Sequence, residues 1–254
     1  MRSLSPAAIA FSGGVDSSLL LETALDCLDG GRLLVLHASS IMQAPDEERR
    51  VVNRLRQLEG RSGVTVVNLA TDPLNWREVA KNNADRCYLC KSRLYKLFLE
   101  VMRKHGFPTL VDGTNVDDLR QERPGLRALR ELQVRTPLVE AGLNKNDIRS
   151  LSRMLGLPTW NVPSSSCLAT RIPHGLEITA DRLERISLWE TRLQRMGFAG
   201  CRVRMDRYSE STVYIEIPVD DMEKFLRQTK RVSVSRYFQS IGIDFVYLNI
   251  SGRS

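Results

Sequence analysis

The segment Ser12-Gly13-Gly14-Val15-Asp16-Ser17-Ser18 carries the residue types with the clearest chemical use in this chain. An apolar stretch precedes it and a helical pattern of leucines follows, so its backbone N–H groups would open a helix. Paired glycines let those groups approach an anion closely, serine hydroxyls add donors, and the helix N-terminus contributes a positive dipole. Asp16 would hold Mg²⁺ or cap the helix. The segment predicts a phosphate-binding loop in preference to a plain serine-capped helix, although it lacks the GxxxxGK[ST] pattern of lysine-based loops.

Three of the five cysteines are suited to metal or thiol chemistry. Cys87 and Cys90 form a CxxC pair, and Cys167 lies much further along the chain in the polar segment SSSCLATR. No fourth cysteine or nearby histidine completes a zinc pattern, whereas three thiolates with one open position fit a [4Fe–4S] cluster. A CxxC pair alone is a weak signal, since a half-buried helix pair without metal is the more common explanation. Core packing explains little at Cys167, because its neighbours are polar.

Basic residues accompany these cysteines. The CxxC pair is flanked by Arg86, Lys91 and Arg93, which would favour the thiolate form, and Arg171 near Cys167 would act in the same sense. The other two cysteines, Cys27 and Cys201, lie in apolar helix and strand patterns and are predicted to be packing residues. An odd, sparse set of cysteines without an export signal argues against a disulfide framework.

The elements that must position these residues alternate between strand and helix patterns. Short apolar runs predict strands at Ala7–Phe11, Leu33–His37, Val64–Leu69 and Thr109–Val111, and amphipathic stretches between them predict helices. This order is typical of an α/β fold with a doubly wound, mostly parallel sheet, which binds its ligand at the carboxyl ends of the strands. Three residues that follow the fourth strand, Gly113, Thr114 and Asn115, are therefore candidate ligand-binding residues.

A second, smaller domain is predicted to follow. Prolines and a serine run interrupt the periodicity between Gly156 and Gly175, so we place domains at 1–170 and 171–254. The second domain would be α+β, with helices at Thr179–Met196 and Met222–Thr229. Its predicted strands are Cys201–Met205, Thr212–Ile217 and Phe245–Ile250. Arg202 and Arg204 alternate on one strand and would share a face, either as a phosphate clamp or as a solvated basic edge.

Composition limits the classes of partner. The chain has 254 residues, a net charge of +7 and 42% hydrophobic residues, which indicates a soluble globular protein with anionic partners. No apolar run is long enough for a membrane anchor or signal peptide, so we expect a cytoplasmic protein. Nucleic acid is a less favoured partner, because aromatic residues do not interleave with the arginines between positions 120 and 135. Those arginines are expected on a solvated or subunit-facing helix surface: Arg120, Arg123, Arg127, Arg130 and Arg135.

Several motifs together resemble one narrow family. They are AFSGGVDSSLLL, RCYLCKSRLY, DGTNVDDLRQERPGLRALRELQVRTPL, LGLPTW, SSSCLATRIPHG and RVRMD, and they span nearly the whole chain. The first resembles the SGGxDS signature of the PP-loop ATP pyrophosphatase superfamily. The full set resembles the ATP-dependent sulfur transferases, or LarE-like sulfur insertases, that make the nickel-pincer nucleotide cofactor of lactate racemase. The DGTNVDD and CLATRIPHG segments are the more specific part of this resemblance.

The resemblance implies a reaction and a set of roles. ATP on the loop Ser12–Ser18 would adenylate a carboxylate of a pyridinium dicarboxylate mononucleotide, and sulfur would then give a thiocarboxylate and AMP. Cys167 would either be sacrificed, leaving dehydroalanine, or join Cys87 and Cys90 on a [4Fe–4S] cluster, which is the version we prefer here. The comparison also suggests Arg202 and Arg204 for the substrate phosphate. Arg171 is a candidate to hold the second carboxylate because of its place near Cys167. The resemblance further implies a homo-oligomer.

Remaining candidates follow from position or from the family. Mg²⁺ is expected near Asp16, with Asp117 or Asp118 assisting. Glu190 and Glu216 would correspond to family acidic residues near the reactive cysteine and are weak candidate metal ligands. His37 is a candidate because it lies at a strand end, where it would neighbour adenine. A structural histidine is the favoured interpretation.

Other functions remain possible from the sequence. PP-loop enzymes that thiolate tRNA also combine a CxxC pair with a distant cysteine, but no zinc ribbon or separate RNA-binding module is recognisable here. A nucleotide-binding redox sensor without turnover is a further alternative. An ammonia-dependent ligase is less favoured, because we find no glutaminase domain before the loop.

Overall fold

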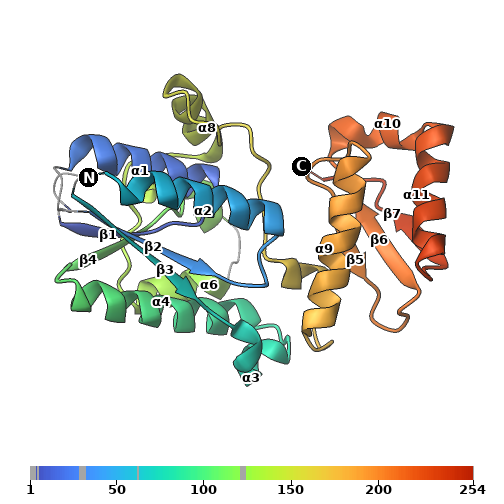
Figure 1. Ribbon diagram of the computed structural model, residues 1–254, viewed down its shortest axis with the longest axis horizontal. Helices are drawn as coiled ribbons and strands as arrows, with labels where there is room; N and C mark the ends of the chain where they lie inside the picture. The colour runs from blue at the N-terminus through green and yellow to red at the C-terminus, as the bar shows by residue number, and fades with distance from the viewer. Residues whose placement is uncertain (1–3, 5, 29–32, 62, 121–123, 254) are drawn as a thin grey trace. The chain divides into compact units, whose positions relative to one another are not determined.

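The computed structural model describes residues 4, 6–28, 33–61, 63–120 and 124–253. The chain divides into two units, which we call unit 1 and unit 2 (Figure 1). Unit 1 consists of Met1–Ser40, Pro45–Pro73 and Asp85–Ser164. Unit 2 consists of Ile41–Ala44, Leu74–Ala84 and Ser165–Ser254. Arg123, one of the arginines expected on a helix surface, lies outside the described residues.

Unit 1 is built on a four-stranded parallel sheet. Its strands are β1 (Ala7–Ala10), β2 (Leu33–Ser39), β3 (Val64–Ala70) and β4 (Thr109–Asp112), in the order β3-β2-β1-β4. Ile9 of β1 lies opposite Val35 of β2 and Val111 of β4, so the central strand is paired on both sides. The predicted doubly wound α/β fold is thereby confirmed, and the carboxyl ends of all four strands lie at one edge.

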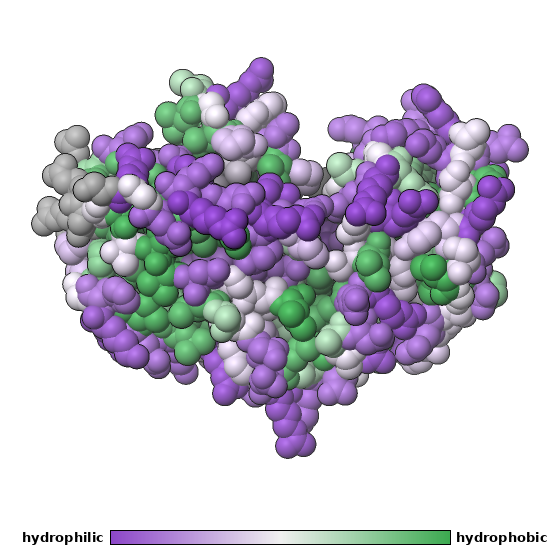
Figure 2. Space-filling model, viewed as in Figure 1, coloured by the Kyte–Doolittle hydropathy of each residue, from purple (hydrophilic) through white to green (hydrophobic). Residues whose placement is uncertain are grey.

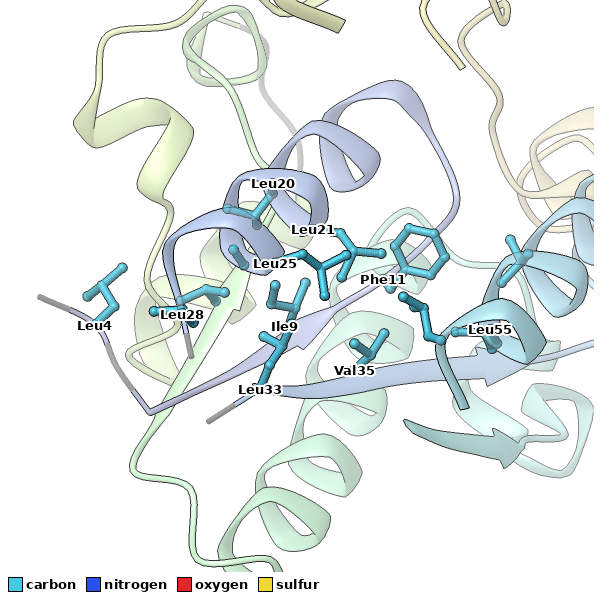
Figure 3. Packing of buried hydrophobic residues seen from close by; sticks show 14 residues of the cluster. Leu4, Ile9, Phe11, Leu20, Leu21, Leu25, Leu28, Leu33, Val35 and Leu55 are labelled. Atoms are coloured by element: carbon cyan, nitrogen blue, oxygen red, sulfur yellow. The ribbon is translucent and has the colours of Figure 1, made fainter. Parts of the chain in front are cut away.

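Helices cover both faces of this sheet (Figure 1). On one face α1 (Val15–Cys27) and α2 (Pro45–Glu59) bury Leu20, Leu21 and Leu55 against Ile9 and Val35 (Figure 3). On the other face, α4 (Arg86–Lys104) and α6 (Pro124–Glu131) pack on Ala8 and Ala10 of β1 and on Leu34 and Leu36 of β2. Both faces of β1 and β2 are therefore buried, which explains why these two strands read as continuous apolar runs, whereas the edge strand β3 is only partly buried.

Shorter helices complete unit 1. These are α5 (Val116–Leu119), α7 (Pro137–Glu140) and α8 (Lys145–Met154). Val15 and Leu19 of α1 turn away from the sheet and pack against Leu138 of α7 and Ile148 of α8. Because α1 is buried on two sides, its leucines are not confined to one stripe. This packing fixes the first turn of α1, where the predicted loop ends.

Unit 2 holds a three-stranded mixed sheet. Strand β5 (Arg202–Met205) pairs antiparallel with β6 (Thr212–Glu216), which pairs parallel with β7 (Phe245–Leu248). The helices are α3 (Arg77–Ala80), α9 (Ala180–Arg195), α10 (Met222–Leu226) and α11 (Gln228–Ser240), with one-turn helices η2 (Pro73–Asn75, which spans both units), η3 (Leu168–Arg171) and η4 (Val219–Asp221). Trp189 of α9 meets Phe238 of α11 edge to face, with ring centroids 6.2 Å apart. The small α+β arrangement expected after the larger sheet is confirmed.

One helix prediction in unit 2 is wrong. The stretch Met222–Thr229 is not a single helix, because the backbone becomes extended at Arg227, between α10 and α11. Helix α11 then continues to Ser240, well beyond the predicted end. Only Val234 and Phe238 of α11 are buried, so its sequence carries little apolar periodicity.

The surface is consistent with the charged composition. Figure 2 shows a face covered mainly by hydrophilic side chains, with separate hydrophobic areas among them. Among the described residues, no helix has both the length and the apolar composition needed to cross a bilayer.

Candidate functional site

The loop after β1 forms a tight turn into α1. Gly14 is the N-cap residue of α1, and the Ser17 hydroxyl donates to its carbonyl at 3.2 Å. The backbone N–H of Ser12 donates to the Ser17 hydroxyl at 3.3 Å. Gly13 has φ +73°, and a Cβ there would come within 2.2 Å of the Val51 side chain. Gly13 is thus required by backbone shape and by close packing, whereas a Cβ at Gly14 would meet only the Ser12 hydroxyl at 3.6 Å.

Gly113, directly after β4, makes a second close approach to this loop. A Cβ on Gly113 would lie 2.9 Å from the backbone nitrogen of Ser17 and 3.1 Å from its Cα. These atoms belong to the first turn of α1 and cannot move without displacing the helix start. The predicted residues of the β1 and β4 loops therefore meet at the carboxyl edge of the sheet.

This close approach gives a testable prediction. Gly113→Ala is expected to weaken binding of ATP, the ligand that the sequence motifs predict for this loop, at least about tenfold and to lower the free energy of unfolding by about 1–3 kcal/mol, because the methyl group overpacks against backbone. Titration with ATP and chemical denaturation measure the two effects. Gly60→Ala is the matched control, since a Cβ at Gly60 meets nothing within 4 Å. Equal behaviour of the two variants would contradict the prediction.

Asp16 is held by two residues from distant parts of unit 1. Its Oδ1 accepts from Asn115 Nδ2 at 3.2 Å, and its Oδ2 lies 2.6 Å from Lys145 Nζ. The side chain does not cap α1, so the capping alternative is wrong. Lys145 also donates its backbone N–H to Asp117 Oδ2 at 2.8 Å. Lys145, which no sequence motif indicated, places a cation beside the loop.

The predicted residues after β4 have defined partners. Asn115 caps α5 and shares a capping box with Asp118. Thr114 donates to Asp112 from its backbone N–H at 2.8 Å and also from its hydroxyl. Burial disfavours ionisation of Asp112, but Lys91 and the hydrogen bonds from Thr114 and Tyr95 outweigh burial and lower the pKa of this carboxyl. This network of charged and hydrogen-bonding groups thus stabilises the loop after β4.

His37 is buried at the end of β2. It is 1% exposed, its Nδ1 lies 2.8 Å from the Phe11 carbonyl oxygen, and its Nε2 lies 3.2 Å from Glu48 Oε2. Both ring nitrogens are therefore engaged within the protein. This environment agrees with the structural role that we favoured over contact with adenine.

The CxxC pair occupies the first turn of α4 in unit 1. Cys87 is exposed and Cys90 is partly buried. The intervening Tyr88 is fixed by α6, because its ring lies 3.5 Å from the Arg127 guanidinium carbon and its hydroxyl donates to Glu131 at 2.7 Å. Arg127 is itself exposed, as expected for the arginines of this region. Cys87 and Cys90 thus lie one helix turn apart, on either side of a tyrosine whose position is fixed by α6.

Cys167 belongs to unit 2, where it is exposed as the N-cap residue of η3. Its carbonyl accepts from the backbone N–H of Thr170 at 2.9 Å and from the Thr170 hydroxyl at 2.8 Å. Arg171 is 5% exposed and forms a bidentate pair with Glu190 at 2.8 and 3.0 Å. Its Nη1 donates to the Ser166 carbonyl at 2.8 Å. Since breaking a buried ion pair costs about 3–5 kcal/mol, Arg171 firmly anchors the segment that carries Cys167.

Arg202 and Arg204 lie on one face of β5, as predicted, with Val203 and Met205 buried on the other face. Arg204 makes a bidentate pair with Glu216 at 2.7 and 3.1 Å and donates to the Thr170 carbonyl at 2.6 Å. The two candidate acidic residues, Glu190 and Glu216, are therefore both paired with arginines. Within the described part of either unit, no three His, Cys, Asp or Glu side chains are arranged to hold a metal ion.

Cys201 has a different environment from Cys87 and Cys167. Burial, reinforced by Glu190, raises the pKa of the Cys201 thiol to about 12, although Arg171 and Arg253 oppose the shift. The thiolate is the reactive form, so Cys201 will be inert near neutral pH. In metal-free native protein at pH 8, iodoacetamide is expected to modify the exposed Cys87 and Cys167 and to spare Cys201 until denaturant is added. Peptide mass spectrometry measures this order, and labelling of Cys201 as fast as the other two would contradict it.

Comparison with known proteins identifies relatives along the full length. No protein-family model matches the chain. An uncharacterised protein of Synechocystis sp. is 33% identical over 249 residues, which cover 98% of this chain and 90% of that protein. The pyridinium-3,5-bisthiocarboxylic acid mononucleotide synthase of Lactiplantibacillus plantarum is 31% identical over 252 residues, covering 99% and 88%. An uncharacterised protein of Methanocaldococcus jannaschii is 28% identical over 243 residues, covering 95% and 88%.

Unit 1 carries a glycine–serine loop at the carboxyl edge of a parallel sheet, and unit 2 carries an exposed cysteine with arginines nearby. Together with the similarity to a synthase, these features mark this chain as a sulfur-transferring enzyme. The chain belongs to the family of the pyridinium-3,5-bisthiocarboxylic acid mononucleotide synthase, the LarE-like sulfur insertases. The family resemblance drawn from the sequence motifs is thereby confirmed.

Proposed function

We propose that this enzyme uses ATP to adenylate a carboxylate of a pyridinium dicarboxylate mononucleotide, releases pyrophosphate, and inserts sulfur to give a thiocarboxylate and AMP. The observation that carries the proposal is the similarity to the curated synthase, which extends over 99% of this chain and so includes both units. The loop chemistry of unit 1 and the thiol chemistry of unit 2 suit the two halves of this reaction. The same proposal includes the site residues named from the sequence, a domain boundary near residue 170 and assembly as a homo-oligomer.

Adenylation is assigned to the loop of unit 1. A carboxylate oxygen of the acceptor attacks the α-phosphorus of ATP, and pyrophosphate leaves with the electron pair of the broken P–O bond. The backbone N–H groups of residues 13–17 and the Lys145 ammonium would stabilise the negative charge that develops on the phosphates. Carboxylate oxygens are the ligands that Mg²⁺ prefers, so Asp16, assisted by Asp117 or Asp118, would hold the metal that accompanies ATP.

Sulfur transfer is assigned to Cys167. In the sacrificial version its thiolate attacks the acyl carbon and AMP leaves; β-elimination then breaks the Cβ–S bond, with loss of the Cα proton, and leaves dehydroalanine. Arg171 acts as a positioning residue here, because its guanidinium is already bound to Glu190 and Ser166. A basic face formed by Arg202 and Arg204 would receive the acceptor's phosphate.

The cluster version needs three thiolates. Cys87 and Cys90 lie one helix turn apart and Cys167 is exposed, so the donor types and their accessibility fit a [4Fe–4S] cluster with one open position. Such a cluster, carrying an extra sulfide on its open position, would supply the transferred sulfur when bound. We favour this version because the chain has all three cysteines.

Anaerobic purification followed by mass spectrometry tests the proposal. The protein is analysed for iron and sulfide, then incubated with ATP, Mg²⁺ and pyridinium-3,5-dicarboxylate mononucleotide. We expect pyrophosphate, AMP and a thiocarboxylate product, with about four irons per chain and an intact polypeptide. Loss of one sulfur at Cys167 without bound iron would instead establish the sacrificial version. Failure to release pyrophosphate with the mononucleotide would overturn the proposed acceptor.

A further inference from the structure

The turn that carries Cys167 is bound by chain segments that lie far earlier in the sequence. The backbone N–H of Leu168 donates to the Met42 carbonyl at 2.8 Å. Further along, the backbone N–H of Ile178 donates to the Ala80 carbonyl at 2.8 Å. Both acceptors belong to the two early segments of unit 2. The position of Cys167 within unit 2 therefore depends on how these early segments hold the chain after it.

Asn82 lies in the second early segment and binds the chain just after the turn. It is 0% exposed, and its Nδ2 lies within hydrogen-bond distance of three carbonyl oxygens. These belong to Ile172 at 3.3 Å, Pro173 at 2.9 Å and Leu176 at 2.8 Å, which share the two amide hydrogens. The Asn82 carbonyl accepts from the backbone N–H of Gly175 at 3.0 Å. One buried residue thus holds this stretch through both its side chain and its backbone.

The backbone of Asn82 explains why asparagine suits this position. Its φ is +58°, in the left-handed region, two residues after the end of α3. Its N–H donates to the Val79 carbonyl at 3.0 Å. Helices often end on a left-handed residue, usually glycine and sometimes asparagine. Glycine would allow the turn but would bring no side-chain donor, whereas asparagine supplies both the backbone conformation and the amide.

The segment that carries Cys167 is therefore anchored twice. Arg171, at the end of η3, is fixed by Glu190, and the residues that follow it are fixed by Asn82. Cys167 is exposed at the start of η3. Its thiol is accessible while the neighbouring backbone is held in one geometry, as transfer to a second molecule requires.

We propose that Asn82 is a positioning residue for Cys167. Its amide holds residues 172–176, these residues hold the turn η3, and the turn sets the direction in which the Cys167 Sγ is presented. That Cys167 transfers sulfur rests on the proposed function, whereas the anchoring of the turn does not. Because Asn82 acts through Cys167, its loss will slow sulfur transfer and spare adenylation by the loop of unit 1.

Asn82→Asp tests this role. Aspartate keeps the size of the side chain and tolerates a left-handed backbone, but a carboxylate cannot donate to the three carbonyls. The single-turnover rate of thiocarboxylate formation is expected to fall about 10²-fold, the size of loss that a misplacement of about 1 Å causes. Release of pyrophosphate should stay at the wild-type rate. Asn83→Asp, the same change at the exposed neighbouring residue, should match the wild type in both measurements.

Hydrogen exchange measures the anchoring without the reaction. In metal-free Asn82→Asp protein, the amides of residues 168–176 are expected to exchange at least about tenfold faster than in the wild type, because the bonds that hold this segment are lost. The amides of β6, the central strand of the small sheet, should keep their wild-type protection. This contrast separates a loosened turn from a destabilised unit.

The outcomes separate the role of Asn82 from the proposed function. Wild-type sulfur transfer by a folded Asn82→Asp variant, or an equal fall in pyrophosphate release and product, would overturn the positioning role. If the aspartate variant does not fold, Asn82→Gly keeps the backbone conformation and is expected to lose sulfur transfer about tenfold, because it removes only the amide. If wild-type protein makes no thiocarboxylate, the proposed function fails, and faster exchange in Asn82→Asp still establishes that Asn82 anchors the Cys167 turn.

Discussion

Replacing Cys167 with alanine will stop thiocarboxylate formation, with a loss on the order of 10³-fold or more, while ATP-dependent release of pyrophosphate continues near the wild-type rate. Alanine cannot attack an acyl adenylate or bind iron. The bonds that shape this turn run from Thr170 to the carbonyl of Cys167, so the backbone of the variant keeps them. Product is measured by mass spectrometry and pyrophosphate by a coupled assay.

Cys27→Ala is the control for this experiment, since Cys27 is the last residue of α1 and has no proposed role. Cys87→Ala distinguishes the two versions of sulfur transfer. In the cluster version it will lose product together with bound iron, whereas in the sacrificial version it will still complete one turnover. Normal product yield from Cys167→Ala would rule out both versions.

Replacing Lys145 with methionine will lower the rate of pyrophosphate release about 10²–10³-fold, the usual cost of removing one group that stabilises transition-state charge. Methionine keeps the length of the side chain and removes the ammonium next to Asp16. The protein should remain folded, because the Lys145–Asp16 pair is partly exposed and such pairs add at most about 1 kcal/mol. Steady-state kinetics with varied ATP and a thermal melt measure the two properties.

Lys104→Met is the matched control, because Lys104 is an exposed lysine at the end of α4 in the same unit. Thiocarboxylate formation by Lys145→Met should fall as much as pyrophosphate release, since sulfur transfer needs the adenylate first. A wild-type rate of pyrophosphate release would show that Lys145 serves only as the partner of Asp16.

The parts of the fold that sequence predicts best are those where local chemistry and burial agree. The runs at Ala7–Ala10 and Leu33–Ser39 are buried on both faces, so a continuous apolar stretch marks each strand. Helix α11 was missed beyond Thr229, because it buries only Val234 and Phe238 and contains β-branched residues that favour strands. There the packing of Phe238 on Trp189 stabilises the helix, and no local pattern reports it.

The residues of the candidate site also differ in how well the sequence alone predicts them. The loop Ser12–Ser18 is recognisable because all its functional atoms come from one short segment. Lys145 has a local signal only for its helix, since Asn144 and Asp147 form a capping box, while its partner Asp16 lies 129 residues away.

Unit 2 is assembled from three separate stretches of chain, and this has a consequence for its order of assembly during synthesis. Residues 41–44 and 74–84 leave the ribosome long before residues 165–254, with which they form one body. The Asn82 side chain, which is fully buried, donates to carbonyls of Ile172 and Pro173, about ninety positions later. Until residues 165–254 have been synthesised, residues 74–84 lack the partners against which they pack. A nascent chain halted before residue 165 will therefore expose residues 74–84 to proteases and chaperones.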